Sequence, residues 1–197
     1  EPIEGQRVEV VRDGLVVGDR RVPIGRVLRW DRFAIDPTTE KPKSAPRAGG
    51  RDEVLLAGGD RLICRVVSMD DEHLVVRWRL ATDQSDWRIP LERVRAVVFR
   101  GARKEIVRRS LSGDHRRPVD ELWLRGGDRM AGELKSLAAE AVVLATEAGS
   151  RRVARESVAV LSMNPELQVV SRRAPRHVRV GFVDGSRLTA AWPKAVA

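Results

Sequence analysis

A stretch of sequence that occurs twice in the chain constrains the fold more than any other feature. Residues 52–62 read DEVLLAGGDRL, and residues 120–130 read DELWLRGGDRM. The correspondence continues without a gap as far as Ser68 in the first copy and Ser136 in the second. Because a repeat of this kind indicates two copies of one structural unit, we expect a chain built from small repeated units.

Each end of the chain carries part of the same unit. Residues 178–188 (VRVGFVDGSRL) resemble the start of a unit. Residues 21–27 (RVPIGRV) resemble residues 88–94 (RIPLERV), which lie near the end of the first full copy. Because open sheet edges attract further strands, we expect these half-units to pair either with each other or with a neighbouring molecule.

Alternating apolar and polar residues predict short strands in the first full copy, with glycine and polar residues in tight turns between them. Strands are expected at residues 53–57, 61–68, 73–80, 86–89 and 94–99, and a single helical turn at 90–93. Five antiparallel strands with such a turn before the last one predict an all-β fold. We expect tandem small antiparallel β units, either bent Sm-like or SH3-like barrels or hairpin sandwiches, joined by linkers.

The segments between the units have the composition of linkers. Residues 36–51 combine Pro, Gly, Ser and Thr without periodicity, and residues 101–119 are rich in arginine, with 105–111 compatible with a short helical turn. The expected organisation is an N-terminal half-unit (1–35), a linker (36–51), a β unit (52–100), a basic linker (101–119), a β unit (120–163), a linker (164–177) and a partial β unit (178–197).

No combination of residues in the sequence has the pattern of an active site. Asp60, Asp128 and Asp184 recur at the hairpin turn of each copy, where an aspartate next to glycine stabilises the turn locally. The three histidines are isolated, and no cluster of His, Cys and carboxylates has metal-ligand spacing. We therefore predict that the protein is not an enzyme and has no catalytic residues, no metal site and no cofactor.

The apolar residues are spread over short segments. No uninterrupted apolar stretch approaches the length of a membrane-spanning helix, so we expect no membrane span. The single cysteine, Cys64, lies in such a short apolar run. It excludes an intrachain disulfide and is expected to be a buried, inert thiol.

The chain carries an excess of basic residues. Its formal net charge of +9 favours acidic partners such as nucleic acid or acidic polysaccharide, through long-range attraction and counterion release. Most basic clusters lie in the expected linkers and lack the interleaved aromatic residues on which bases stack. The candidate polyanion-binding residues are Arg103, Lys104, Arg108, Arg109, Arg116 and Arg117.

The tryptophans of the two copies divide into core and surface positions by their place in the alternating pattern. Trp78 and Trp87 alternate in register with apolar residues that face the core, so we expect both to be buried. Trp123 falls between two core-facing leucines and therefore points away from the core, as does Arg125. Trp123 and Arg125 are thus the candidate ligand-contact residues.

Several short motifs resemble a known group of β-repeat proteins. They are residues 124–134 (LRGGDRMAGEL) and 180–188 (VGFVDGSRL), the elements Val22-Pro23-Ile24 and Ile89-Pro90-Leu91, and the connector Met163-Asn164-Pro165. Together they are similar to the β-repeat region of exported planctomycete-type proteins, in which such repeats often precede a carbohydrate-binding module called NPCBM. The module itself is not seen in this sequence. The resemblance implies an exported or cell-envelope protein, with carbohydrate as one ligand to consider, and it implies no particular site residues.

One principal hypothesis and two alternatives follow from these observations. The principal hypothesis is a non-catalytic β-repeat scaffold or interaction module, which binds a protein partner or a second copy of itself through sheet edges. The first alternative is an Sm-like nucleic-acid-binding protein, favoured by the positive charge. The second is a carbohydrate-binding protein that uses Trp123.

Overall fold

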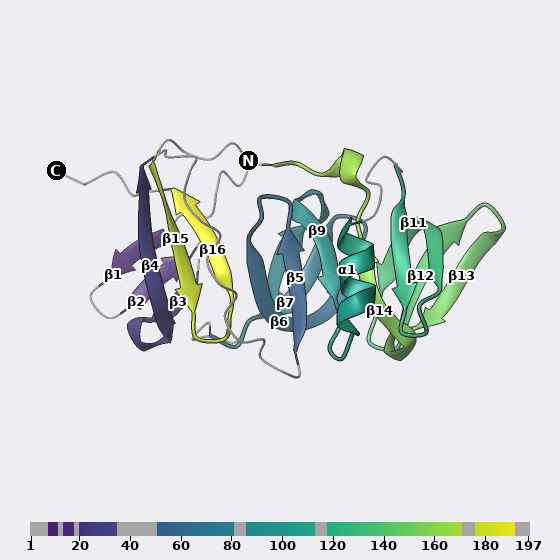
Figure 1. Ribbon diagram of the computed structural model, residues 1–197, viewed down its shortest axis with the longest axis horizontal. Helices are drawn as coiled ribbons and strands as arrows, with labels where there is room; N and C mark the ends of the chain where they lie inside the picture. Colours follow the sequence, from purple (N-terminus) through teal and green to yellow (C-terminus); the bar gives the residue numbers. More distant parts are fainter. Residues whose placement is uncertain are drawn as a thin grey trace.

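The chain folds into antiparallel strands that follow one another along the long axis of the molecule (Figure 1). The computed structural model describes residues 8–11, 14–17, 20–34, 51–80, 86–112, 118–170 and 176–191. Strands dominate these residues, and the single α-helix among them is short. The predicted all-β class is therefore confirmed.

The central part of the fold contains the elements expected for the first full unit. They are β5 (Asp52–Leu56), β6 (Arg61–Met69), β7 (His73–Arg77), β8 (Asp86–Pro90), the 3-10 turn η2 (Leu91–Arg93) and β9 (Val94–Val98). β5 lies between β6 and β9, and β6 pairs onward with β7, which pairs with β8. The long strand β6 takes part in both sets of pairs because its register shifts between Val66 and Ser68, where a bulge allows the strand to bend.

The same order of elements follows in the second full unit. They are β10 (Asp120–Leu124), β11 (Arg129–Leu137), β12 (Ala141–Thr146), β13 (Gly149–Ala154), the 3-10 turn η3 (Arg155–Ser157) and β14 (Val158–Ser162). β10 lies between β11 and β14, and β11 pairs onward with β12 and β12 with β13. The register of β11 shifts between Leu134 and Ser136, which align in sequence with Val66 and Ser68.

The two ends of the chain pair with each other. The N-terminal elements are β1 (Val8–Val11), β2 (Gly14–Val17), β3 (Arg20–Pro23), the 3-10 turn η1 (Ile24–Arg26) and β4 (Val27–Ala34); the C-terminal ones are β15 (Arg176–Phe182) and β16 (Arg187–Ala191). β15 pairs with β16 on one side and along its whole length with β4 on the other. Figure 1 shows the purple N-terminal strands beside the yellow β15 and β16. Of the two partners expected for the half-units, the structure thus contains pairing within one chain.

One backbone hydrogen bond occurs in all three groups of strands and shows how their positions correspond. In each group, the residue after the first strand donates its amide N–H to the carbonyl of the last residue of the 3-10 turn. The pairs are Ala57 with Arg93 (2.8 Å), Arg125 with Ser157 (2.8 Å) and Val183 with Arg26 (2.9 Å). The first strand and the 3-10 turn therefore meet in the same way in each group.

The hairpin turns correct the predicted alignment of the three aspartates. Each turn contains one glycine with positive φ, a conformation that favours glycine, at Gly59, Gly127 and Gly185. The carbonyl of the next residue accepts the amide N–H of the last residue of the strand, in the pairs Leu56 to Asp60, Leu124 to Asp128 and Phe182 to Ser186. Ser186, and not Asp184, therefore occupies the position of Asp60 and Asp128.

One continuous hydrophobic core runs through all three groups of strands. It contains buried residues from both ends of the chain, such as Val22 and Phe182, together with residues of both full units. Trp78 stacks on Trp87 with ring centroids 5.3 Å apart and meets the ring of Phe182 edge-on at 4.9 Å. The predicted burial of Trp78, Trp87 and Cys64 is confirmed.

The segment expected to be a basic linker forms α1 (Lys104–Ser112). Ile106, Val107 and Leu111 recur at the spacing of one helix face and pack against the surface of β9 and β14 that faces away from the main core. α1 lies in front of β14 in Figure 1. In the described part of the chain, no helix is long and apolar enough to span a membrane.

The connector after the second full unit returns to the central part of the fold. Asn164 caps the 3-10 turn η4 (Pro165–Leu167) by accepting the amide N–H of Glu166 at 2.9 Å. Val169 then donates its amide N–H to the carbonyl of Glu92 in η2, at 2.7 Å. Residues 164–170 of the linker expected at 164–177 are thus held against the central unit, whereas residues 176 and 177 already belong to β15. The linker expected at 36–51 lies outside the described residues apart from Arg51.

Candidate functional site

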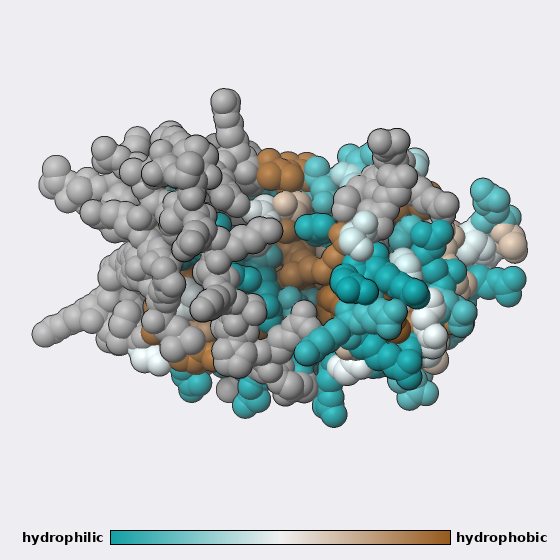
Figure 2. Space-filling view, viewed as in Figure 1, coloured by the Kyte–Doolittle hydropathy of each residue, from teal (hydrophilic) through white to brown (hydrophobic). Residues whose placement is uncertain are grey.

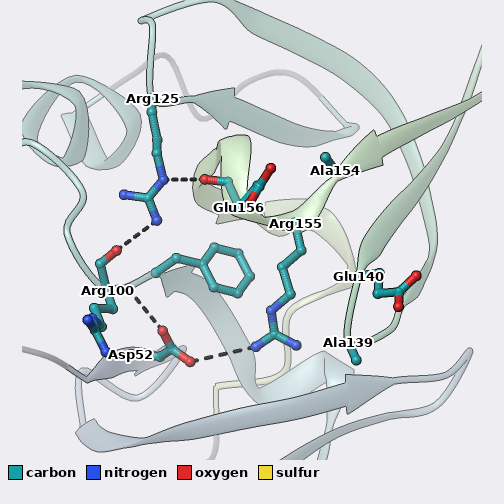
Figure 3. Close-up of a pocket in the computed structure, with 9 residues that line it drawn as sticks. Asp52, Arg100, Arg125, Ala139, Glu140, Ala154, Arg155 and Glu156 are labelled. Carbon is teal, nitrogen blue, oxygen red and sulfur yellow. Dashed lines mark hydrogen bonds and ion pairs between the residues drawn. The ribbon is translucent and has the colours of Figure 1, made fainter.

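A cavity lies beside the junction of the two full units. The units are joined by antiparallel pairing of β9 with β14, with Val97 opposite Leu161 at the centre. The cavity has a volume of about 570 Å³, and its charged lining makes it the candidate functional site (Figure 3). Its lining residues are Asp52, Phe99, Arg100, Arg125, Ala139, Glu140, Ala154, Arg155 and Glu156.

Asp52, at the start of β5, ties two other parts of its unit to that strand. Its Oδ2 accepts the amide N–H of Val66 at 3.0 Å, next to the bulge of β6, and its Oδ1 accepts the amide N–H of Arg100 at 2.9 Å, just after β9. Its carboxylate also lies 3.7 Å from the Arg155 guanidinium. The carboxylate of Asp52 is therefore used mainly to satisfy backbone donors that strand pairing leaves free.

Asp120 occupies the matching position in the second unit and makes the matching bonds. Its Oδ2 accepts the amide N–H of Leu134 at 2.8 Å, and its Oδ1 accepts the amide N–H of Asn164 at 2.7 Å. Burial raises the pKa of Asp120, since desolvation disfavours the ionised form more than these two hydrogen bonds favour it; Glu133 adds to the rise. The same local construction thus appears in both units.

Arg155 connects the second unit to the first. From the start of η3 its guanidinium reaches β6, where Nη2 donates to the carbonyl of Val66 at 2.6 Å and Nη1 donates to the carbonyl of Val67 at 3.1 Å. Nη1 also donates to the carbonyl of Ala138 at 3.2 Å, and the guanidinium lies 5.2 Å from the centre of the Phe99 ring. One side chain therefore holds three carbonyls and an aromatic face at the junction.

The charge of Arg155 is enclosed to a large extent by the two units. Its side chain is only 17% exposed. Desolvation lowers the pKa of Arg155, the attraction of Asp52 opposes that shift, and the nearby Arg65 adds to it. Because the guanidinium stays charged in proteins, its hydrogen bonds and Asp52 must offset the cost of burying it.

Arg125 makes a second connection on the other side of the cavity. Its Nε donates to the carbonyl of Glu156 at 2.5 Å, and its Nη2 donates to the carbonyl of Arg100 at 2.7 Å, as Figure 3 shows. Arg125 thus joins η3 to the segment between β9 and α1. Arg125, a candidate for ligand contact, is therefore engaged with the backbone of the protein itself.

The cavity is lined by equal numbers of positive and negative groups, of which some bond to the protein and others are exposed. Three guanidinium groups and three carboxylates line it. Asp52, Arg125 and Arg155 are engaged in the bonds described above, whereas Arg100, Glu140 and Glu156 have exposed side chains at the rim. The arrangement can hold two units rigidly together, and it leaves groups of both signs at the opening.

Trp123 lies on the outer face of the sheet, as its place in the alternating pattern predicts. It is half-buried and packs with the α1 cluster rather than the main core. Its Nε1 donates to Glu121 Oε2 at 3.2 Å, and the Arg129 guanidinium lies 5.8 Å from the ring centre. Helix α1 and Arg129 thus take up part of the surface that was expected to be open for a ligand.

Four of the candidate polyanion-binding residues lie together at α1. Arg103, Lys104, Arg108 and Arg109 are exposed there. Arg109 lies 3.7 Å from Glu105, one helical turn away. Figure 2 shows hydrophilic side chains gathered over this part of the molecule. The other two candidates, Arg116 and Arg117, lie outside the described residues.

Comparison with known proteins does not assign the chain to a family. No protein-family model matches it, and no curated protein sequence is significantly similar to it. Among the described residues, no group of three or more His, Cys, Asp or Glu side chains could hold a metal ion. The function is therefore inferred from the contacts of the chain's own residues.

Asp52, Asp120 and Arg155 were not among the residues that the sequence pattern singled out as candidate site residues. Asp52 and Asp120 stand first in the two aligned repeats, so their agreement was a usable sign of a shared structural role. Arg155 gives no such sign, because Leu91 occupies its place in the first unit and its partners in β6 are far away in sequence. Only the docking of the two units brings Arg155 to them.

Proposed function

We propose that the protein is a non-catalytic scaffold or interaction module made of tandem Sm-like β units, which binds partners through its surface and its free sheet edges. The observation that carries this proposal is the use of Asp52, Arg125 and Arg155. The more enclosed charged groups that line the cavity are engaged with the protein itself: Asp52 bonds within the first unit, and Arg125 and Arg155 connect the second unit to the first. A catalytic site instead keeps such groups available for a substrate.

The order of elements supports the Sm-like, repeated character of the units. In both full units a long strand with a register shift follows the first strand, and a 3-10 turn precedes the last one. The last strand returns to pair with the first. This order of elements supports the proposal that each unit is a small, strongly bent five-stranded barrel.

The free edges support the proposed role in binding. Within the described residues, β13 pairs only with β12, β8 only with β7, and β4 only with β15. A free edge presents unpaired N–H and C=O groups that a further strand can bind. On the motifs quoted above, we also propose a kinship with the exported β-repeat proteins, for which a scaffolding role at the cell envelope is consistent with this architecture.

A second candidate function is binding of a polyanion, and the α1 surface favours it. In the part of the chain that is described, Arg103, Lys104 and Arg108 are exposed and make no ion pair. Nucleic acid or an acidic polysaccharide could neutralise them, with a strong dependence on salt concentration. Two features argue against it: the helix carries no aromatic residue for stacking, and Glu105 lies among the basic residues.

The experiment that separates these functions measures binding of RNA, DNA, heparin and neutral glycans to the purified chain. The test variant carries Arg103→Gln, Lys104→Gln and Arg108→Gln. A matched variant carries Arg79→Gln, Arg151→Gln and Arg152→Gln, which remove the same charge from exposed positions elsewhere. The scaffold proposal predicts that any weak binding falls equally in both variants. Binding lost in the α1 variant alone would establish the polyanion function instead, and glycan binding lost in Trp123→Ala would establish the carbohydrate function.

A further inference from the structure

The contact between the two full units is nearly two-fold symmetric. Val97 lies opposite Val54 within the first unit, and Leu161 lies opposite Leu122 within the second. Val97 and Leu161 thus hold corresponding positions, and they also face each other at the centre of the β9–β14 pair. The last strand of one unit therefore binds the last strand of the other along the same edge, centred on the same position.

The strand β4 is the counterpart of β9 and β14 in the third group of strands. It follows η1 as β9 follows η2, and it pairs with β15 as β9 pairs with β5. Trp30 lies opposite Val180, which places Trp30 at the position of Val97 and Leu161. Within the described residues the other edge of β4 has no strand beside it.

We propose that two copies of the chain associate by antiparallel pairing of β4 with β4, centred on Trp30. This proposal rests on the proposed scaffold function and names a second copy of the chain as the partner. The β9–β14 pair within one chain is the precedent for the contact, because it shows that the corresponding edges of two units pair with each other. A two-fold contact of this kind closes on itself and yields a dimer.

The charges on β4 fit this register. With Trp30 opposite Trp30 of the second copy, Arg29 is opposite Asp31 of the second copy, and the symmetry repeats the pair on the other side of the axis. In the register within the chain Arg29 lies opposite Gly181, and in the proposed register it lies opposite Asp31 of the second copy. Asp31 lies opposite Arg179 on β15. In the proposed dimer, Arg29 of the second copy lies opposite Asp31 on its free side, so that positive and negative residues alternate across the three strands.

The hydrogen-bond pattern of the model contact favours these charge pairs. In the β9–β14 contact, Phe99 N–H donates to Ala159 at 2.9 Å and Met163 N–H donates to Arg95 at 3.0 Å. The intervening pair of Val98 and Val160 is therefore of the non-hydrogen-bonded type, in which opposite side chains come closest. Arg29 and Asp31 of the second copy would occupy that type of position.

The other free edges differ from that of β4. β8 also carries opposite charges, Asp86 and Arg88, on either side of a tryptophan, but it is the fourth strand of its unit and is therefore not the counterpart of β9 and β14. The residues of β13 include Arg151 and Arg152, are almost all exposed and bring charge of one sign to that edge. A basic edge of this kind resists pairing with itself. The edge of β4 carries charges of opposite sign on either side of a central residue, which is the arrangement that an antiparallel pair with itself requires.

The experiment measures the mass of the full chain in solution by sedimentation equilibrium over a range of protein concentrations. The proposal predicts a reversible dimer. Arg29→Asp places like charges opposite each other twice, and we expect the dimer to weaken at least about tenfold. Adding Asp31→Asn to that variant removes the repulsion, and we expect part of the affinity to return. Arg151→Asp, on the edge of β13, is the matched control and should leave the dimer unchanged.

A second variant tests the backbone contact without relying on charge. Residue 32 corresponds to Phe99, whose N–H donates across the β9–β14 contact, so the N–H of residue 32 is directed to the free edge of β4. Arg32→Pro therefore removes a donor from the proposed contact and spares the pairing with β15. We expect Arg32→Pro to be monomeric with an unchanged far-ultraviolet circular dichroism spectrum.

A monomeric wild-type chain, or a dimer that neither Arg29→Asp nor Arg32→Pro weakens, would overturn the proposed contact. The result is distinguishable from failure of the scaffold function. If the chain is a dimer that binds RNA through α1, the proposed β4–β4 contact stands and the scaffold function is refuted. If the chain is a monomer without affinity for polyanions, the scaffold function stands and the proposed contact is refuted.

Discussion

Arg155 Nη2 donates a hydrogen bond of 2.6 Å to the carbonyl of Val66, a residue 89 positions earlier in the chain and in the other full unit. The same guanidinium serves Val67 and Ala138 and lies near Asp52. Because the carbonyls of Val66 and Val67 are partly buried, they would be left without a donor if the side chain were shortened. Much of the cohesion between the two units is therefore expected to depend on one residue.

Replacing Arg155 with alanine should destabilise the protein by about 2 to 4 kcal/mol, since two partly buried carbonyls and Asp52 lose their partner. Arg155→Lys should be intermediate, because an ammonium keeps the charge but cannot bridge the three carbonyls in the same way. Urea unfolding measures both effects. Arg151→Ala, at an exposed position on β13, is the control and should change the free energy of unfolding by less than about 0.5 kcal/mol. An equal, small effect of Arg155→Ala would show that the junction does not depend on this contact.

The pKa of Asp120 should lie above that of an ordinary aspartate, whereas the pKa of Asp70 should lie below it. Burial raises the first, and the amide N–H groups of Glu72 and His73 lower the second. Since the pKa of Asp120 is higher in the folded state than in the unfolded chain, its contribution to stability is complete below the unfolded value and is lost as the pH rises through the folded value. Carboxyl-carbon NMR titration checks the order of the two pKa values. The reverse order would contradict the buried position given to Asp120.

Cys64 should not react with a thiol reagent in the folded protein at mildly alkaline pH. Burial is the main cause that raises its pKa well above the usual value, and the carboxylates of Asp52 and Asp184 raise it further, so the reactive thiolate is scarce and shielded. Absorbance during titration with an aromatic disulfide measures the reaction. We expect a full equivalent of thiol to appear only after unfolding by guanidinium, and rapid labelling of the native protein would place Cys64 outside the core.

Gly132→Ala should destabilise the protein by about 1 to 3 kcal/mol, because it forces strand β11 away from β12. A Cβ atom at Gly132 would meet the carbonyl oxygen of Ala145 at a distance shorter than any allowed contact. Gly58→Ala is the matched control, since a Cβ atom there has no neighbour within 4 Å. Thermal unfolding of the two variants compares them. Equal transition temperatures would contradict the close approach of β11 and β12.

The strands and the core could be predicted from the sequence because alternation is a local signal. Val54, Leu74 and Val76 face the core as their spacing predicts, and Trp123 faces the other side. The short helical turn allowed at 105–111 lies within helix α1, but the packing of that helix could not be predicted, since Ile106, Val107 and Leu111 stand among arginines in a segment whose composition resembles a linker. The apolar face of α1 has a surface to pack against only when β9 and β14 lie side by side.

The junction between the units could not be predicted from the sequence. The pairing of Val97 with Leu161 and the reach of Arg155 to β6 both depend on contacts between distant segments. The position of Asp184 was misjudged for a simpler reason: a turn aligned by residue type placed aspartate on aspartate, whereas the positive φ of Gly185 shows the true correspondence. The contacts between distant segments and the geometry of the turns therefore could not be predicted from residue type alone.

The central claim is that the protein is a scaffold rather than a nucleic-acid-binding protein, and the most direct measurement is the salt dependence of its affinity for single-stranded RNA, followed by tryptophan fluorescence. The scaffold account predicts no saturable binding at physiological salt. Saturable binding whose logarithmic affinity falls steeply and linearly with the logarithm of salt concentration, and which the α1 variant with Arg103→Gln, Lys104→Gln and Arg108→Gln abolishes, would contradict it.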